Sequence, residues 1–500
     1  MNLLAFGSNG SGQLGLGHEE DVSTPTKCLF THPTEQKQDD KIIQIVAGGN
    51  HTLILTETGT VYASGCNTDS RCGIPSPAAQ ELNDQEPRAE TQAGTQDYNS
   101  NININTFQRV VLIDHETGTT VKKFKCIAAT WEGSLLVSEI ELNDGTAQDR
   151  VFVHGSSAKG ELGVERSTLQ PGTSIPNFPP SNTSIRSIKS SMNHTVTVLC
   201  NGTVYGWGAS RKGQLGENLK AGKIIYTPSQ IDVPFHATNA VSGREFTVIV
   251  GDKEKGEIIV FGDQFNRWGI CDVRDGEGLR ERVRTRIREW DSEIQVEESE
   301  LDRDQDREQR KEKEKEKGGD GDGARASVGL SSHASTSATS PTGSTSMSQS
   351  WCQWGFGFED IGASWHGIYV LVRTRGHGHG HGRFVNPNSD KHDEKDEDGN
   401  GNGIIVSWGR NDRGQLPDAA LPSVHKLAVG SEHALVLLGD GSVAAFGWGE
   451  HGNCGPDTDN RGNVSGYKVI SLPDTSAKVR GSGRVVGVGA GCATSWVILD

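Results

Sequence analysis

The stretch VTVLCNGTVYGWGASRKGQLGE (residues 196–217) contains the pattern that decides the fold of this chain. Two runs rich in β-branched and aromatic residues flank the dipeptide Asn201-Gly202. Asn-Gly between such runs is a strong signal for a two-residue hairpin, because both turn residues adopt positive φ angles. The second run ends in glycine and leads into a loop that closes on QLG (214–216). The segment therefore predicts an antiparallel hairpin followed by a tight, glycine-dependent loop.

This pattern recurs along the whole chain. A strand that ends in glycine, followed by a loop like the QLG loop, occurs seven times, at residues 3–17, 61–74, 151–164, 204–217, 258–270, 404–417 and 443–456. A second half-motif, an apolar segment followed by a Gly-x-x-His-Thr type of sequence and an apolar strand, also occurs seven times. Its copies are residues 45–55, 127–137, 188–199, 240–250, 361–371, 427–437 and 488–499. Such self-similarity is typical of repeat architectures.

The order of the two half-motifs indicates how the repeats close. The chain begins with the second half of a unit, at residues 3–17, and ends with the first half of one, at residues 488–499. A closed ring, in which strands from both termini complete one unit, explains this order; an open solenoid does not. Short antiparallel sheets arranged radially leave few exposed edges and form a β-propeller. We predict an all-β, seven-bladed β-propeller closed by its N- and C-terminal strands.

Composition limits the class of protein further. The chain has 500 residues, of which 64 are glycine, and a formal net charge of −16. Glycine costs about 1 kcal/mol at each helix-interior position, which argues against a helical fold. The net negative charge argues against direct DNA binding. No apolar run reaches the roughly 18 residues of a membrane span, and the N-terminus has no signal-peptide pattern. The nine cysteines contain no CxxC pair, which favours a reduced intracellular protein.

Three segments interrupt the repeats, and we expect them to be disordered. Residues 76–107 are rich in Gln, Asn and Glu, residues 272–350 join a charged run to a serine-rich tract, and residues 376–403 begin with GHGHGHG. None of them sustains an apolar stripe that would dock it on a core. The chain is therefore predicted to be a single propeller domain, residues 1–500, with three disordered insertions.

The paired half-motifs resemble the regulator of chromosome condensation repeat, which is found in seven-bladed propellers, and the resemblance covers all seven units. Within it, four segments are similar to the fungal alpha-tubulin suppressor family, also known as killer-toxin-insensitivity factors. These are AFGSNGSGQLGLGHEEDVSTP (5–25), GGNHTLIL (48–55), FGWGEHGNCGP (446–456) and GCATSWVIL (491–499). The last two are more specific than a QLG loop. The long insertions depart from the pattern of that family.

The resemblance to the suppressor family implies a non-enzymatic adaptor. It implies that the propeller binds a small CSL-zinc-type protein of diphthamide synthesis, as a monomer in a heterodimer. The pair would support diphthamide synthesis and Elongator-dependent modification of the tRNA wobble uridine, with Elongator as an indirect partner. The same resemblance implies a cytoplasmic and nuclear location. It leaves open which face of the propeller holds the partner and what the insertions do.

Candidate partner-binding residues come from aligning the repeats just before the His-Thr position. Trp131 and Trp365 share the repeat position of partner-facing residues in related propellers. Tryptophan, methionine and arginine on one rim are typical of interface hot spots, and nearby glutamates would form an acidic ring that attracts a basic partner. The alternative is that the tryptophans pack between blades. The candidates are Trp131, Glu132, Met192, Arg244, Glu245, Trp365, His366, Glu432, Glu450 and His451.

Two other functions are compatible with this fold. Guanine-nucleotide exchange on a Ran-type GTPase needs only a propeller face, but the basic N-terminal tail of the chromatin-bound founder has no counterpart before Leu3. An enzyme is the second alternative, although phosphate-loop, nucleophile-elbow and zinc-protease motifs are absent. His51, His194 and His433 recur at one repeat position, which favours hydrogen bonds between blades over catalysis.

The histidines of the third insertion raise the question of a metal site. His377, His379 and His381 alternate with glycine and are followed by several aspartates. A tract this flexible has no preorganised ligand geometry. We therefore expect neither a metal nor a cofactor in this protein.

Overall fold

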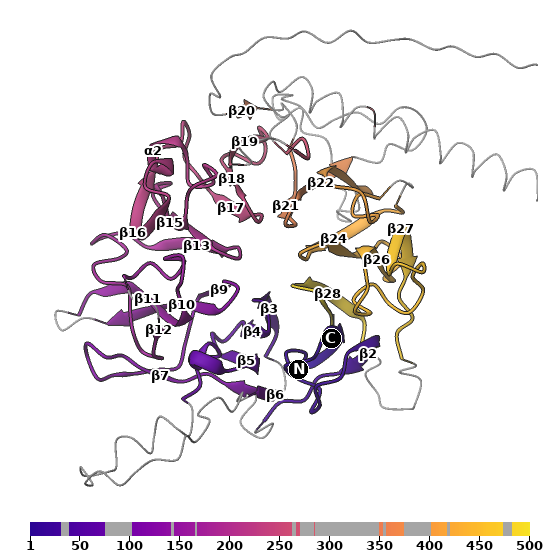
Figure 1. The fold of residues 1–500 in the computed structure, drawn as a ribbon, viewed down its shortest axis with the longest axis horizontal. Helices are drawn as coiled ribbons and strands as arrows, with labels where there is room; N and C mark the ends of the chain where they lie inside the picture. The colour runs from indigo at the N-terminus through magenta and orange to yellow at the C-terminus, as the bar shows by residue number, and fades with distance from the viewer. Residues whose placement is uncertain are drawn as a thin grey trace, which may run out of the picture. The chain divides into compact units, whose positions relative to one another are not determined.

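Seven β-sheets stand around a common axis in the part of the chain that this computed structural model describes (Figure 1). Each sheet is one blade, with its first strand beside the axis and its last strand at the rim. Of the blades in the described residues, six have four strands and one has three. The predicted seven-bladed propeller is therefore confirmed. The described residues are 1–31, 40–75, 103–141, 145–165, 168–262, 267–270, 285, 350–353, 357–374, 402–417, 421–473 and 483–500.

The blades are numbered in chain order, and their strands are given from the axis outward. Blade 1 contains β3 (Ile42–Ala47), β4 (His51–Thr56), β5 (Val61–Cys66) and β6 (Asn103–Arg109); blade 2 contains β9 (Cys126–Ala129), β10 (Gly133–Glu141), β11 (Ala147–Ser156) and β12 (Thr168–Leu169); blade 3 contains β13 (Ile185–Ser190), β14 (His194–Leu199), β15 (Val204–Ala209) and β16 (Ile224–Ile231). Blade 4 contains β17 (Asn239–Ser242), β18 (Phe246–Val250), β19 (Glu257–Gly262) and β20 (Ser350–Gln353); blade 5 contains β21 (Asp360–Ala363), β22 (Gly367–Thr374) and β23 (Asn402–Gly409). Blade 6 contains β24 (Val424–Val429), β25 (His433–Leu438), β26 (Val443–Trp448) and β27 (Asn463–Val469); blade 7 contains β28 (Val485–Ala490), β29 (Thr494–Leu499), β1 (Asn2–Gly7) and β2 (Val22–Lys27).

A few short elements lie outside the blades. They are the pair β7 (Leu112–Ile113) and β8 (Thr120–Val121), the 3₁₀ turn η2 (Thr68–Ser70) and the single helical turn α2 (Glu217–Lys220). No helix among the described residues has the length and apolar character that crossing a bilayer requires. Contacts divide the chain into two units, Met1–Val283 with Gln349–Asp500, and Arg284–Ser348. The blades belong to the first unit, and only residue 285 of the second is described.

Blade 7 closes the ring with strands from both ends of the chain. Strand β1 pairs with β29 over its full length, from Asn2 opposite Leu499 to Gly7 opposite Thr494. The side-chain Nδ2 of Asn2 also donates a hydrogen bond to the backbone oxygen of Asp500, at 3.2 Å. The closure predicted from the order of the half-motifs is therefore confirmed.

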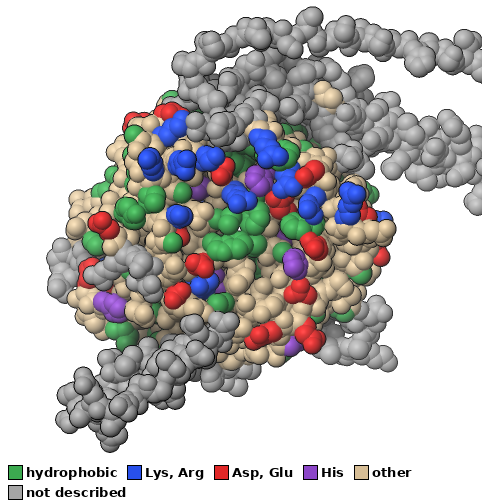
Figure 2. Space-filling model, viewed as in Figure 1, with side chains coloured by type: hydrophobic (Ala, Val, Ile, Leu, Met, Phe, Trp, Pro, Cys, Tyr) green, Lys and Arg blue, Asp and Glu red, His purple; other side chains and the backbone are tan. Residues whose placement is uncertain are grey.

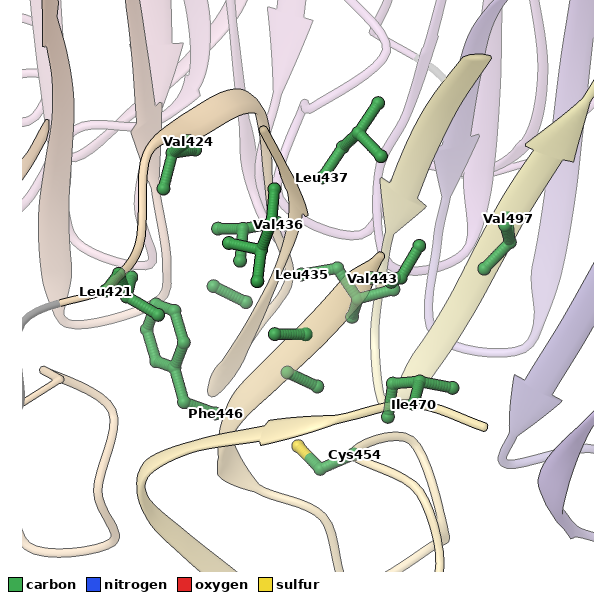
Figure 3. Close-up of a cluster of buried hydrophobic side chains, with 14 of the residues drawn as sticks. Leu421, Val424, Leu435, Val436, Leu437, Val443, Phe446, Cys454, Ile470 and Val497 are labelled. Atoms are coloured by element: carbon green, nitrogen blue, oxygen red, sulfur yellow. The ribbon is translucent and has the colours of Figure 1, made fainter. Parts of the chain in front are cut away.

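The hydrophobic core lies between neighbouring blades rather than at the axis. The second strand of a blade is buried on both faces; in β4, β14 and β25, for example, all six residues are buried. Figure 3 shows one inter-blade cluster, which runs from Phe446, beside Leu421, through Val436 of blade 6 toward Val497 of blade 7. Burying a Val, Leu or Phe side chain stabilises a fold by about 1.5–3 kcal/mol. Each blade is therefore stabilised mainly by its two neighbours.

The predicted boundaries of the three insertions differ from those in the structure. Residues 103–107, assigned to the first insertion, begin rim strand β6, and Ser350, assigned to the second, begins rim strand β20. Residues 402–403, assigned to the third, begin β23. A rim strand pairs on one side only, so its sequence carries little of the repeat pattern. Apart from residue 285, the rest of these insertions lies outside the described residues.

Glycine at the end of each third strand lets the chain turn close to the preceding loop. Gly208 has a φ of +98°, and a Cβ atom there would collide with the backbone oxygen of Asn193. The equivalent Gly65, with a φ of +112°, would collide with the oxygen of Asn50. These positions need glycine both for the positive φ and for the close approach.

The recurring histidines link neighbouring blades. The Nε2 atoms of His51, His194 and His433 each lie 2.9 Å from a hydroxyl oxygen on the second strand of the next blade. These hydroxyls belong to Ser134, Thr247 and Ser495, respectively. The prediction that these histidines form hydrogen bonds between blades is confirmed.

The residue after the histidine position carries a hydroxyl group, and this hydroxyl bonds to the preceding blade rather than to the next one. Ser134 donates to the backbone oxygen of Arg71 at 2.6 Å, and Ser495 donates to that of Asn453 at 2.7 Å, in each case in the preceding blade's loop. Because each hydroxyl proton is used in this way, Nε2 of the histidine must carry the proton that it donates. In blade 3, His194 bonds to Thr247 of blade 4 and the Thr195 hydroxyl donates to the backbone oxygen of Glu161 in blade 2, so one His-Thr dipeptide serves two junctions.

Candidate functional site

The candidate residues lie at one end of the ring, which we call the tryptophan face. It is formed by the loops between the first and second strands of the blades, at residues 48–50, 130–132, 191–193, 243–245, 364–366, 430–432 and 491–493. Loops after the third strands, including residues 449–462, end on the same side because strands alternate in direction. Figure 2 shows hydrophobic side chains at the middle of a face of the ring, with an arc of Lys and Arg beside them, on the side of blades 4 and 5.

Trp131 and Trp365 meet over the axis. Their ring centroids are 5.9 Å apart with an interplanar angle of 49°, although they come from blades 2 and 5. Both are half-buried and line a cavity of about 240 Å³ among the innermost strands, together with Met192 and Cys492. The two rings therefore cover the mouth of the central cavity and do not pack between adjacent blades.

Backbone hydrogen bonds fix the positions of these tryptophans. The N–H of Trp131 donates to the oxygen of Met192 at 3.2 Å, and the N–H of Trp365 donates to the oxygen of Ser431 at 2.9 Å. Gly49 and Arg244 donate in turn to the oxygens of Trp131 and Trp365. A Cβ atom on Gly49 would lie 2.8 Å from the indole of Trp131, so glycine makes room for that ring. Loops of successive blades are thus joined around the mouth.

The acidic ring predicted on this face is mostly neutralised by nearby cations. Glu245 is exposed and lies 3.8 Å from the Lys212 amino group. Glu132 lies 3.9 Å from Arg71. Glu450 is exposed. Such exposed pairs contribute about 0–1 kcal/mol each, but they cancel much of the local negative charge.

Glu432 occupies a different place from the one predicted. Its side chain is only 6% exposed, and Oε1 accepts hydrogen bonds from His366 Nδ1 at 3.1 Å and Arg410 Nη1 at 3.2 Å. Its Oε2 accepts a bond from Gln415 at 2.8 Å. Burial alone would raise the pKa of Glu432, but these bonds and the Arg410 charge lower it below its ordinary value. Glu432 therefore joins blades 5 and 6 and presents no free charge to a partner.

His451 and His366 also have partners within the propeller. His451 Nδ1 lies 2.9 Å from Oδ2 of Asp21, which links the loop after β26 to blade 7. His366 is half-buried and lies 6.3 Å, ring to ring, from Trp268. Of the ten predicted residues, Trp131, Met192, Arg244 and Trp365 come together at the mouth of the cavity, while His451 and Glu450 lie toward blade 7.

Arginines and tryptophans stack beside this mouth, and three of them, Arg267, Trp268 and Arg410, were not among the predicted residues. The guanidinium carbon of Arg244 lies 5.6 Å from the Trp365 ring, and those of Arg267 and Arg410 lie 4.7 and 5.3 Å from the Trp268 ring. Trp268 stands at the repeat position that holds a buried leucine such as Leu215 in other copies. That departure from the repeat was the available signal.

A pocket of about 260 Å³ opens between blades 4 and 5 at this group. Its lining residues are Lys212, Arg244, Glu245, Phe246, Arg267, Trp268, Ile270, Trp365 and His366. Cationic and aromatic side chains dominate it, so its chemistry favours a negatively charged ligand with a planar or apolar part.

No cluster of metal-ligating side chains is found among the described residues. Residues 376–401, which contain the alternating histidines considered above, lie outside the described part of the chain.

Family models match parts of the chain. A model of the regulator of chromosome condensation (RCC1) repeat matches residues 2–55 and 201–250, and a second RCC1-repeat model matches residues 42–71. These segments of the chain are therefore similar to RCC1 repeats. The matched residues include strands of blades 7, 1, 3 and 4 of the propeller.

Relatives and solved structures of RCC1-repeat type extend the likeness to the full chain. An RCC1 repeat-containing protein of Schizosaccharomyces pombe is 25% identical over 505 residues, which cover 100% of this chain and 99% of the relative. The crystal structure of human WBSCR16 is similar with a TM-score of 0.58 and 13% identity, covering 100% of this chain and 98% of that one. Saccharomyces cerevisiae Prp20p, whose structure is described with its binding to Gsp1p and histones, gives 0.55 and 17%, covering 100% and 91%. These structures support the fold.

Proposed function

We propose that this propeller is a non-enzymatic adaptor that docks a protein partner on its tryptophan face. The observation that carries the proposal is the meeting of Trp131 and Trp365 over the cavity mouth, beside Met192 and Arg244. Half-buried tryptophans held by backbone bonds lose little entropy on binding, and Trp and Arg are the residues most enriched in hot spots. The recurring histidines are buried and form hydrogen bonds between blades.

The partner that we propose is a small CSL-zinc-type protein of diphthamide synthesis, bound as a heterodimer. The support is the resemblance of residues 446–456 and 491–499 to the fungal alpha-tubulin suppressor family. In this proposal the pair acts in the cytoplasm and nucleus. It supports diphthamide synthesis and Elongator-dependent modification of the tRNA wobble uridine, with Elongator reached indirectly.

Replacing both tryptophans should strongly weaken binding of the partner. We expect Trp131→Ala/Trp365→Ala to weaken binding of the purified small zinc protein by about 30-fold or more, since hot-spot tryptophans contribute at least about 2 kcal/mol. Pull-down and calorimetric titration measure the effect. The matched control is Ile43→Ala/Val469→Ala, which removes exposed apolar side chains at the strand ends away from the tryptophan face. Undiminished binding by the folded tryptophan variant would remove this face from the proposal.

A second candidate is guanine-nucleotide exchange on a Ran-type GTPase. It is favoured by the likeness over the whole chain to Prp20p, which is described as binding Gsp1p. Release of a fluorescent guanine nucleotide from Ran, with and without this propeller, distinguishes the two functions. Clear acceleration at micromolar propeller would replace the adaptor proposal, and an unchanged rate would leave it in place.

A further inference from the structure

We propose that the pocket between blades 4 and 5 binds an acidic peptide segment that carries an apolar anchor residue. The proposal refines the docking function above by assigning the chemistry of the bound segment, and it rests on that function only for the face involved. The prediction of an acidic ring implied the opposite charge on the partner. We infer the charge of the partner segment from the side chains that line this pocket rather than from the glutamates of the ring.

The arginines of the pocket are available to carboxylates. Among the described residues, no carboxylate lies within ion-pair distance of Arg244 or Arg267, whose guanidinium groups instead stack on Trp365 and Trp268. Stacking holds a guanidinium plane in place while its N–H edge stays open, and that edge matches the two oxygens of a carboxylate. Arg410 differs, because Asp412 and Glu432 already hold it, and it serves to brace Trp268 from the other blade.

The apolar part of the ligand has a place beside these arginines. Trp365 lines both the pocket and the central cavity, so the two spaces adjoin at this ring. A leucine or similar side chain next to the carboxylates would cover Trp131 and Trp365 at the cavity mouth. Apolar contact at this desolvated centre supplies affinity, and the surrounding ion pairs supply orientation.

A peptide suits the site better than a nucleic acid. The whole chain has a net charge of −16, which repels a long polyanion. Glu245 lines the pocket itself, paired with Lys212, and Glu132 and Glu450 lie elsewhere on the same face, so carboxylates interrupt any longer basic track. Screening over about 8 Å at physiological salt lets a short acidic segment respond to that pocket alone. A phosphate backbone needs a longer basic track.

The test measures binding of a fluorescein-labelled peptide, Glu-Glu-Glu-Leu-Glu-Glu-Glu, to the full chain by fluorescence anisotropy. We expect the Arg244→Gln/Arg267→Gln variant to bind at least about tenfold more weakly and the Arg244→Lys/Arg267→Lys variant to lose less, because lysine keeps the charge but not the planar fork. The matched control is Arg186→Gln/Arg484→Gln, at exposed sites near the other end of innermost strands. A peptide with glutamine for glutamate should bind weakly to every form.

Two results would overturn the proposal. One is equal peptide binding by the wild type and the arginine-to-glutamine variant. The other is tighter binding of a ten-nucleotide oligothymidylate than of the acidic peptide. Pull-down of the small zinc protein with the same variants separates this proposal from the adaptor function. A chain that captures the zinc protein through its tryptophans but ignores the peptide would refute the acidic-ligand site alone.

Discussion

Lowering the pH from 6.5 to 5 should reduce the free energy of unfolding by about 6 kcal/mol, or about 1.5 kcal/mol for each of four buried histidines. Burial lowers the pKa of His51 and His154 to about 3 and of His194 and His433 to about 4. In the unfolded chain these side chains titrate at about 6.5. Below that value the unfolded state binds more protons, so stability is complete above about pH 7 and declines toward pH 4.

The structure explains why these rings stay neutral when the chain is folded. Nε2 of His51 and His433 already donates to a hydroxyl, and Nδ1 of each has no hydrogen-bond partner among the described residues. A proton on Nδ1 would therefore create a buried N–H without an acceptor and a buried charge. Both ring nitrogens of His154 lack a partner in the described part of the chain.

Urea denaturation at pH 7, 6 and 5 measures this dependence. His154→Leu should remove about a quarter of the slope, because leucine replaces a ring that makes no hydrogen bond. The matched control is His115→Gln, at an exposed histidine, which should leave the slope unchanged. A stability that is flat between pH 7 and 5, or a full slope in His154→Leu, would contradict the assignment.

Deleting residues 1–7 should abolish folding of the propeller. The deletion removes β1, whose Leu3, Leu4 and Phe6 are buried in two inter-blade clusters, and leaves β29 with an unpaired edge. Losing a buried leucine or phenylalanine side chain costs about 2–5 kcal/mol, so the loss of three is comparable to the roughly 5–15 kcal/mol stability of a typical domain. Circular dichroism and size-exclusion chromatography should show an unfolded or aggregated chain.

A circular permutant separates ring closure from simple loss of sequence. Asp500 is joined to Met1 by a short glycine linker, which the 3.2 Å bond between Asn2 and Asp500 permits, and the chain is opened between Asp440 and Gly441. Gly441 has open space around it in the exposed β25–β26 turn. We expect the permutant to fold with blade 6 as its closing blade. An unfolded permutant together with a folded deletion variant would show that the pairing of β1 in blade 7 is not required for the propeller to fold.

Much of the fold follows from local signals in the sequence. Asn201-Gly202 marks a hairpin, and glycines such as Gly208 mark the close turn after each third strand, because backbone geometry there tolerates little else. The rim strands escaped prediction: β6 and β20 pair on one side only, so pairing with β5 and β19 fixes them more than their own residues do.

The sequence predicted which repeat positions form the site, but not the contacts or the burial of its side chains. Alignment placed Trp131 and Trp365 at one repeat position, but not their contact, which depends on how far the loops of blades 2 and 5 reach over the axis. Glu432 has the same alignment status as Glu245, yet one is buried and the other exposed, because Arg410, His366 and Gln415 surround only the first.

The pairing of Asn2 with Leu499 and of Gly7 with Thr494 sets the direction in which both chain ends point. Gly7 and Thr494 are at the tryptophan face, so Met1 and Asp500 are at the other side of the ring, about 20 Å away along six-residue strands. A biotin, fluorophore or surface tether at either end therefore leaves the tryptophans facing solution. Binding can be measured with the protein attached to a surface by either end. Equal affinities from the two attachments would show that the tether does not affect binding at the tryptophan face.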